Sequence, residues 1–129
     1  SNIDVWSMNS TTGTPKIRWT NNSNVDSSPD WSRDGTKIAY NSDRVGGADD
    51  DLYVMPGIAP TLPEAPVTLT VNTDVDRFPI WSSDDSLIIF CRVSGPTSNI
   101  WATKPDGSGM VQLTFAVSPA SCDNPDWGW

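Results

Sequence analysis

Carboxylates are the main chemically active groups that this sequence offers. The 129 residues include 16 Asp and Glu, eight Lys and Arg, and no His, and the acidic residues are densest at 49–51 and 84–85. Calcium requires about six to eight converging oxygen ligands. Consecutive aspartates on an extended chain point in divergent directions, so we interpret these clusters as solvated turns and expect neither a metal nor a cofactor.

Nucleophilic catalysis lacks its usual residues. Without His, the chain can form neither a Ser-His-Asp nor a Cys-His arrangement, and two cysteines alone make no zinc site. Two carboxylates would suffice for hydrolysis of the glycosidase type, but no pair stands out. The turn Ser32-Arg33-Asp34-Gly35 resembles the Asp-box of sialidase propellers, although Gly follows Asp directly and no Trp comes after it, and that box is structural. We predict no catalytic residues.

Charge and hydropathy exclude two classes of partner. The net charge of −8 argues against binding to nucleic acid or to an anionic membrane surface, because both need cationic contacts. No apolar run approaches the roughly 18 residues that span a bilayer, and the first residues show no basic-then-apolar leader. We expect a soluble protein that does not insert into a membrane.

Cys91 and Cys122 are the two thiols of the chain. An oxidising compartment would permit a bridge between them, but the sequence alone does not establish the Cβ geometry that a bridge requires. We expect free buried thiols, with the disulfide as the alternative.

The elements that position these residues form a repeat. Pro-x-Trp recurs with its Trp at positions 31, 81 and 127, which are 50 and 46 residues apart. Such a period is typical of stacked or radial architectures. Two further landmarks keep the same order: Asp4-Val5-Trp6, Asp51-Leu52-Tyr53 and Asn99-Ile100-Trp101, and then Trp19-Thr20, Leu69-Thr70 and Leu113-Thr114.

Each repeat contains four short segments of strand length, rich in Val, Ile, Thr and aromatic residues and separated by turn-forming residues. No window shows a helical period. Asp34-Gly35 favours a tight hairpin turn, and Asp84-Asp85 forms a weaker one. Runs of consecutive apolar residues, at 52–55 and 87–90, indicate sheets that are covered on both faces. A radial array of four-stranded sheets, a β-propeller, satisfies this requirement.

The first repeat resembles the TolB-type propeller, a relative of the WD-repeat blade. The resemblance is carried by residues 4–9, by 27–40 with its Ser-Ser-Pro-Asp-Trp-Ser-Arg-Asp-Gly-Thr-Lys-Ile-Ala-Tyr, and by 41–44. Later repeats depart from it, with Asp85 where Gly is usual and a longer connection at 55–60. The resemblance implies that the Pro-x-Trp segment is the innermost strand and the Ile-Ala-Tyr segment the second. It also implies that Asp-Val-Trp begins the third strand and that the segment ending in Leu-Thr is the outermost.

We therefore predict one all-β domain, residues 1–129, that forms a partial propeller of about three four-stranded antiparallel blades, two complete and one split between the termini. Eleven strands are expected, and the repeat landmarks fall at 3–20, 29–72, 79–117 and 125–129. Because propellers have about four to eight blades, open flanks would be association sites. Either the chain is a piece of a longer propeller, or a second copy completes six blades as a homodimer.

The tryptophans divide into two groups. Five occupy repeat-equivalent positions, and we expect them to pack between blades, where each buried ring contributes about 1.5 to 3 kcal/mol: Trp6, Trp31, Trp81, Trp101 and Trp127. We predict self-association through Trp19, Trp127 and Trp129.

The resemblance implies a non-catalytic scaffold, periplasmic or secreted, that binds a protein or peptide at one end of the ring. Residues 26–28 and 76–78, which begin inner strands, are the expected contacts, with Asp43, Arg44 and Arg92 as charged neighbours. The partner-binding residues are therefore Asp26, Ser27, Ser28, Asp43, Arg44, Asp76, Arg77, Phe78 and Arg92.

Two other functions stay open. A substrate-gating propeller of a larger peptidase, of the tricorn or prolyl-oligopeptidase kind, would need a Gly-x-Ser-x-Gly elbow and a downstream His in the parent gene. A carboxylate-dependent carbohydrate enzyme would need two acids that face each other in a pocket.

Overall fold

A computed structural model describes residues 2–44, 49–58, 66–116, 122 and 125–126. Within these ranges the chain has ten strands and no helix, and so no helix that could cross a membrane. The strands are β1 (Trp6–Met8), β2 (Lys16–Arg18), β3 (Asp26–Trp31), β4 (Lys37–Ser42), β5 (Asp51–Pro56), β6 (Val67–Thr68), β7 (Val75–Trp81), β8 (Ile88–Ser94), β9 (Thr97–Thr103) and β10 (Val111–Gln112).

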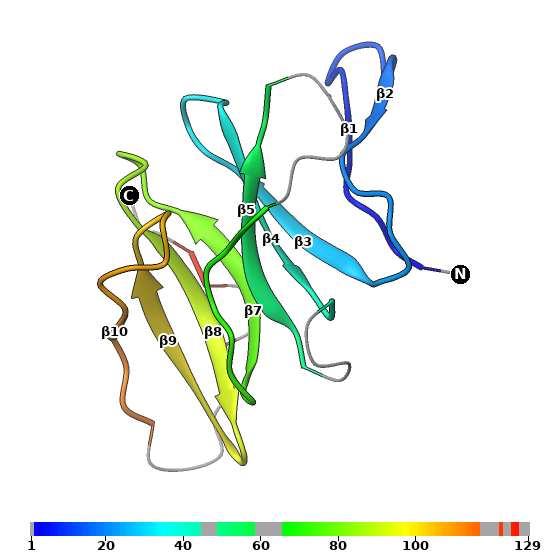
Figure 1. Ribbon diagram of the computed structural model, residues 1–129. Helices are drawn as coiled ribbons and strands as arrows, with labels where there is room; N and C mark the ends of the chain where they lie inside the picture. Colours follow the sequence, from blue (N-terminus) through cyan, green and yellow to red (C-terminus); the bar gives the residue numbers. More distant parts are fainter. Residues whose placement is uncertain (1, 45–48, 59–65, 117–121, 123–124, 127–129) are drawn as a thin grey trace.

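The strands form three antiparallel sheets that stand side by side in chain order, from blue to orange in Figure 1. We call them the edge sheet (β1–β2), the first blade (β3–β6) and the second blade (β7–β10). In each blade the strands are hydrogen-bonded in sequence order. This confirms the predicted all-β partial propeller. Of the inner strand expected at 125–129, Pro125 and Asp126 are described and are not in a strand, while 127–129 lie outside the described residues.

A threonine holds the third strand of each repeat, β1, β5 and β9. Its hydroxyl oxygen accepts a hydrogen bond from the backbone N–H of the residue that follows the landmark Asp or Asn. The donors and acceptors are Val5 and Thr20 at 2.9 Å, Leu52 and Thr70 at 2.9 Å, and Ile100 and Thr114 at 2.8 Å. This shared contact explains why the two landmarks recur together, in the same order, in every repeat.

Asp85 takes the place that Gly35 has in the first blade. Both residues have positive φ, 57° and 69°, a conformation that Asp tolerates better than most residues. The Asp85 carboxylate accepts hydrogen bonds from the backbone N–H groups of Arg33 (2.7 Å) and Asp34 (3.0 Å) of the first blade. The departure from Gly therefore adds a link between the two blades.

The core consists of two hydrophobic layers, one on each side of the first blade. The edge sheet and the first blade enclose Val5, Trp19, Ile38, Tyr40, Tyr53 and Met55. The two blades enclose Ala39, Leu52, Val54, Leu69, Trp81, Ile88 and Phe90. Since alternate residues of β4 and β5 point into different layers, both faces of this sheet are covered, as the consecutive apolar residues predict.

The predicted burial of the tryptophans is correct for some and wrong for others. Trp81 is 5% exposed, and Trp101 is partly buried against the same layer. Trp6 is 53% exposed because it lies on the edge-sheet face that no described sheet covers, and Trp31 is 40% exposed at the end of β3. Trp127 and Trp129 lie outside the described residues.

Trp19 is buried within the chain, which corrects its predicted place at a self-association surface. Its side chain is only 7% exposed, and its indole N–H donates a hydrogen bond to Ser7 Oγ at 2.7 Å. Its ring packs edge-on against Trp31, with 5.4 Å between the centroids. Trp19 occupies the position of Leu69 in the next repeat, so it belongs to the layer between sheets.

Cys91 and Cys122 form a disulfide, so the expectation of free thiols is wrong. Their Cα atoms are 5.6 Å apart, within the range of about 4.4–6.8 Å that disulfides require. Cys91 lies on β8, and Cys122 precedes Pro125 by three residues, the position held by Asp26 and Asp76 before the other two landmark prolines. The bridge thus joins the second blade to the segment that opens the next repeat.

Candidate functional site

The inner strands of the two blades, β3 and β7, enclose a shallow hollow between them, which we call the inner-strand groove. Its volume is about 270 Å³. Each strand contributes the same three positions of the repeat, Ser28, Pro29 and Asp30 from β3 and Phe78, Pro79 and Ile80 from β7. The groove is therefore a joint product of two repeats.

A β-bulge shapes each wall of the groove. The pairing of β3 with β4 shifts between Ser27 and Asp30, and that of β7 with β8 shifts between Arg77 and Ile80. Within the bulges, Ser28 has φ 51° and Phe78 has φ 57°. A positive φ costs a non-glycine residue about 1–3 kcal/mol and is concentrated at functional sites.

Proline suits the next position of the bulge. It has no backbone N–H to donate to the ladder, and within sheets it is confined to edges, strand starts and bulges. Pro29 and Pro79 both lie in the bulges, so the Pro-x-Trp landmark marks the place where each inner strand breaks its pairing. The sequence shows the landmark but not the bulge.

Asp30 places a carboxylate in the groove. Its Oδ2 accepts a hydrogen bond from the backbone N–H of Trp81 at 2.8 Å, and its backbone oxygen accepts one from the Trp81 indole N–H at 3.2 Å. Burial raises the pKa of Asp30 above its usual value, and the negative charge of Asp85 adds to this effect. All eight Lys and Arg lie in the described ranges, and none forms an ion pair with Asp30.

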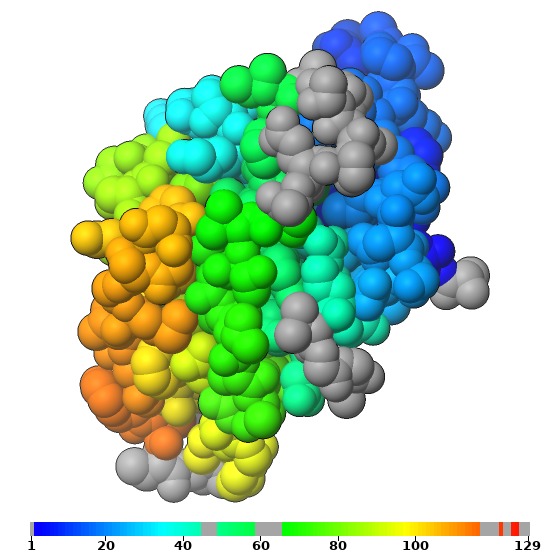
Figure 2. Space-filling view, viewed as in Figure 1, coloured from blue at the N-terminus to red at the C-terminus, as the bar shows by residue number. Residues whose placement is uncertain are grey.

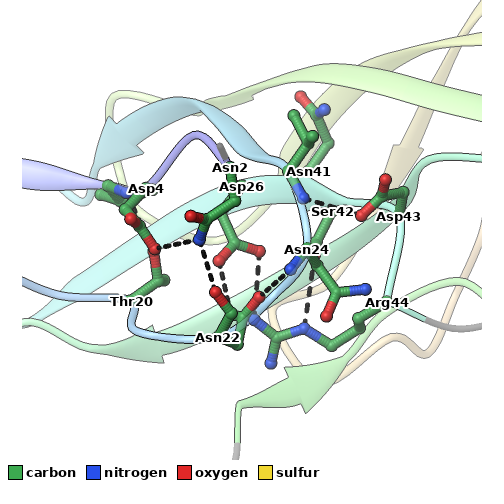
Figure 3. A network of polar contacts seen from close by, with 12 residues as sticks. Asn2, Asp4, Thr20, Asn22, Asn24, Asp26, Asn41, Ser42, Asp43 and Arg44 are labelled. Atoms are coloured by element: carbon green, nitrogen blue, oxygen red, sulfur yellow. Dashed lines mark hydrogen bonds and ion pairs between the residues drawn. The ribbon is translucent and has the colours of Figure 1, made fainter.

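The first residues of the inner strands are held inside the fold. Asp26 is fully buried, pairs with Arg44 at 3.2 Å, and accepts a hydrogen bond from Asn22 Nδ2 at 2.6 Å. The Arg44 guanidinium lies over the rings of Tyr40 and Tyr53, 5.6 and 4.8 Å from their centroids. Figure 3 shows this cluster, in which Asn22 and Arg44 approach Asp26 from the flanking segments. We call it an Asn-Asp-Arg clamp.

The second blade repeats the clamp. Buried Asp76 accepts hydrogen bonds from Arg92 Nε (2.7 Å) and Nη2 (2.8 Å), and one from Asn72 Nδ2 (2.9 Å). Arg92 lies over the rings of Phe90 and Trp101. The hydrogen bonds to Asp76 raise the pKa of Arg92, so the guanidinium keeps its charge although it is largely buried.

The clamps change the interpretation of the predicted partner-binding residues. Four of these residues form ion pairs with one another within the chain, Asp26 with Arg44 and Asp76 with Arg92. Three further polar residues of the set also have partners: Asp43 accepts from the Val25 N–H at 2.8 Å, Ser27 Oγ accepts from Asn41 Nδ2 at 2.9 Å, and Arg77 pairs with Asp50.

Of the predicted contacts, Ser28 and Phe78 line the groove. Pro29, Asp30, Pro79 and Ile80 line it as well and are absent from the prediction, although each belongs to a Pro-x-Trp landmark. The landmark is therefore the signal in the sequence that locates the groove.

The acidic cluster at 49–51 is not the solvated turn that the sequence suggests. Asp51 is 1% exposed, and its carboxylate accepts a hydrogen bond from the Thr70 hydroxyl at 3.1 Å. Burial raises its pKa. Asp50 pairs with Arg77. Among the described residues, no three acidic or cysteine side chains are grouped so that they could hold a metal ion.

A second hollow lies on the face of the edge sheet that neither described blade covers. It has a volume of about 500 Å³ and is lined by Trp6, Ser7, Met8 and Lys16. Trp6 and Met8 are 53% and 63% exposed. We call this face the open flank. The edge sheet, blue in Figure 2, lies at one side of the molecule.

Comparison with solved structures finds the same architecture in two TolB proteins. A protein provisionally assigned as TolB from Agrobacterium tumefaciens superimposes with a TM-score of 0.72 over 86% of this chain, at 21% identity. TolB from Acinetobacter baumannii gives a TM-score of 0.70 over 93% of this chain, also at 21% identity. The chain spans 40% and 28% of these two proteins. The predicted TolB-type propeller fold is thus confirmed. No protein-family model and no curated protein matches this sequence.

Proposed function

We propose that this partial TolB-type propeller is a non-catalytic scaffold that binds a protein or peptide at the inner-strand groove and closes its ring with another copy. The groove is the observation that carries the proposal. It combines apolar side chains with the carboxylate of Asp30 and is built on two strained bulges, features typical of binding sites.

The use of the other carboxylates supports a non-catalytic role. Arginines pair with Asp4, Asp26, Asp50 and Asp76. Hydrogen bonds within the turns occupy Asp34, Asp84 and Asp106 and lower their pKa values. These groups have structural partners in the chain, so they are poorly suited to act as an acid and base pair on a bound sugar.

The open flank supports ring closure. Trp6 and Met8 are repeat-equivalent to Tyr53 and Met55, which are 1% and 6% exposed because the edge sheet covers them. The open flank therefore has the residue types of an interface between blades, but no described blade packs against it. We propose that a blade of a second copy covers it, within the six-bladed ring that the TolB resemblance implies.

The disulfide supports a periplasmic or secreted location. Such bonds persist in oxidising compartments and are rare in the cytosol.

Partner binding can be tested by panning a random peptide library on the immobilised chain. Selected peptides should lose affinity for Pro29→Trp, which fills the groove from an exposed position, and should keep it for Ser83→Trp, on an exposed turn. If the selected peptides bind both variants equally, the groove is not the binding site.

Ring closure can be tested separately by light scattering. We expect the mass of a dimer for the parent chain and of a monomer for Trp6→Ser. The matched control is Val71→Ser, which alters a residue that is 70% exposed but lies outside the open flank. A parent chain that stays monomeric would end the ring proposal and leave the groove proposal intact.

A further inference from the structure

We propose that the inner-strand groove holds a cationic side chain of the partner, an ammonium or a guanidinium group, paired with the carboxylate of Asp30. The inference rests on the proposed function and adds to it the chemical class of the group that is bound.

Asp30 differs from the other aspartates on β3 and β7. Asp26 and Asp76, on the same two strands, each have an arginine within the chain. Asp30 lines a hollow and receives its side-chain hydrogen bond from a backbone N–H, and no Lys or Arg of the chain pairs with it. A half-buried carboxylate in a groove, without a cation of its own, is a site where a ligand can supply one.

The surroundings of Asp30 penalise its negative charge. Partial burial removes water from the Asp30 carboxylate, and the negative charge of Asp85 repels this carboxylate. Both effects raise the pKa of Asp30. A cation placed beside Asp30 would offset both. The net charge of −8 would also attract a cationic partner at long range.

The apolar walls fit the stem of a long cationic side chain. Pro29, Pro79 and Ile80 flank the carboxylate, and the methylene stems of Lys and Arg pack readily on such surfaces. The volume of the groove is about 270 Å³. Pockets that enclose a whole small molecule are larger, at about 300–1,000 Å³. The groove therefore suits one extended side chain better than a cofactor.

Three peptides that differ in one side chain test the proposal. We would titrate the ¹⁵N-labelled chain with acetyl-Gly-Lys-Gly-amide, with its norleucine analogue, which keeps the stem without the charge, and with its Glu analogue. The Lys peptide should shift the amide signals of Asp30 and Trp81 and bind more weakly at high salt. The norleucine peptide should bind at least about tenfold more weakly, a loss of about 1.4 kcal/mol.

Asp30→Asn removes the charge but keeps an oxygen that can accept from the Trp81 N–H. It should reduce affinity for the Lys peptide by about tenfold or more. Asp106→Asn, the same change on an exposed turn, should leave the affinity unchanged. Equal binding of the Lys peptide by the parent and by Asp30→Asn would overturn the proposal.

Two further results separate this inference from the proposed function. If the Lys and norleucine peptides shift the groove signals with equal affinity, the cationic class is wrong while the groove remains a peptide site. If none of the three shifts them, and library peptides also fail to distinguish Pro29→Trp from Ser83→Trp, both proposals are wrong.

Discussion

Single aspartates take three roles in this chain, depending on which donors surround them. In the clamps, Asp26 and Asp76 are buried against arginine. In the turns, Asp84 is exposed, and hydrogen bonds from Ser86 and Ser82 lower its pKa to about 2. Asp30 is half-buried without a cation, and its pKa is raised. The aspartates of the clamps and the turns therefore stabilise the folded state, whereas the charged form of Asp30 in the groove destabilises it.

The raised pKa of Asp30 gives a pH-dependent prediction. The folded state holds this proton more tightly than the unfolded chain, so Asp30 is unfavourable for folding above its folded pKa and has no such effect below its unfolded value, near 3.8. Asp30→Asn should therefore keep or raise the Tm at about pH 7, and should not raise it at about pH 3. Thermal unfolding followed by circular dichroism measures this.

Asp106→Asn is the control with the opposite sign. The pKa of Asp106 is lowered by hydrogen bonds from Ser108, so its charged form favours folding above the unfolded pKa, and this contribution is lost as the pH falls through the folded pKa. The substitution should lower the Tm at about pH 7. If Asp30→Asn lowered the Tm there by as much as Asp106→Asn, the argument from desolvation would be wrong.

Among the elements, each inner strand is fixed at two points with different chemistry. The clamp holds an aspartate at the beginning of the strand to an arginine that lies on the second strand (Arg92) or just after it (Arg44), and the bulge follows within a few residues. The clamp thus lets the strand begin in a buried position, while the bulge turns Ser28 or Phe78 toward the groove. An exposed pair between blades, Asp50 with Arg77, offers a comparison, because Arg77 is 47% exposed.

The clamp should contribute far more to stability than the exposed pair. Removing one partner of a buried ion pair costs about 3–5 kcal/mol, because the other charge stays buried without a partner. We expect Asp76→Ala to show a loss of this size in urea unfolding, and Arg77→Ala to cost less than about 1 kcal/mol. The double variant Asp76→Ala/Arg92→Leu should lose less than the sum of its single variants. Strict additivity would mean that the two side chains do not interact.

Across the whole molecule, the period of the sequence predicts the architecture and not the contacts between repeats. Landmark spacing and covered strands were sufficient for the sheet order, because both follow from the backbone and from hydrophobic burial. The disulfide and the link from Asp85 depend on which side chains of different repeats meet in space. Trp6 is an example. Its residue type and its position in the repeat predict burial, but its exposure depends on whether another sheet covers it.

The candidate site was predictable in part for the same reason. The repeat placed Ser28 and Phe78 at equivalent positions of inner strands. The equivalent of Asp30 in the second repeat is Ile80, so no acidic residue recurs at this position of the two blades and the repeat does not single Asp30 out.

The layer between the blades should depend strongly on Trp81. Trp81 is 5% exposed, and its backbone N–H and its indole N–H donate hydrogen bonds to Asp30 across the interface. Trp81→Ala should cost about 3–5 kcal/mol through lost burial and the cavity left behind. Equilibrium unfolding in urea measures it, with Trp31→Ala, whose ring is 40% exposed, as the milder control. Equal losses for the two variants would contradict the assigned burial.

The bond between Cys91 and Cys122 spans 31 positions of the chain. A protease that cuts once inside this span would leave two fragments that still migrate as one band until a reductant is added. The segment that starts the next repeat would thus survive such a nick attached to its neighbour, even where the polypeptide itself is no longer continuous.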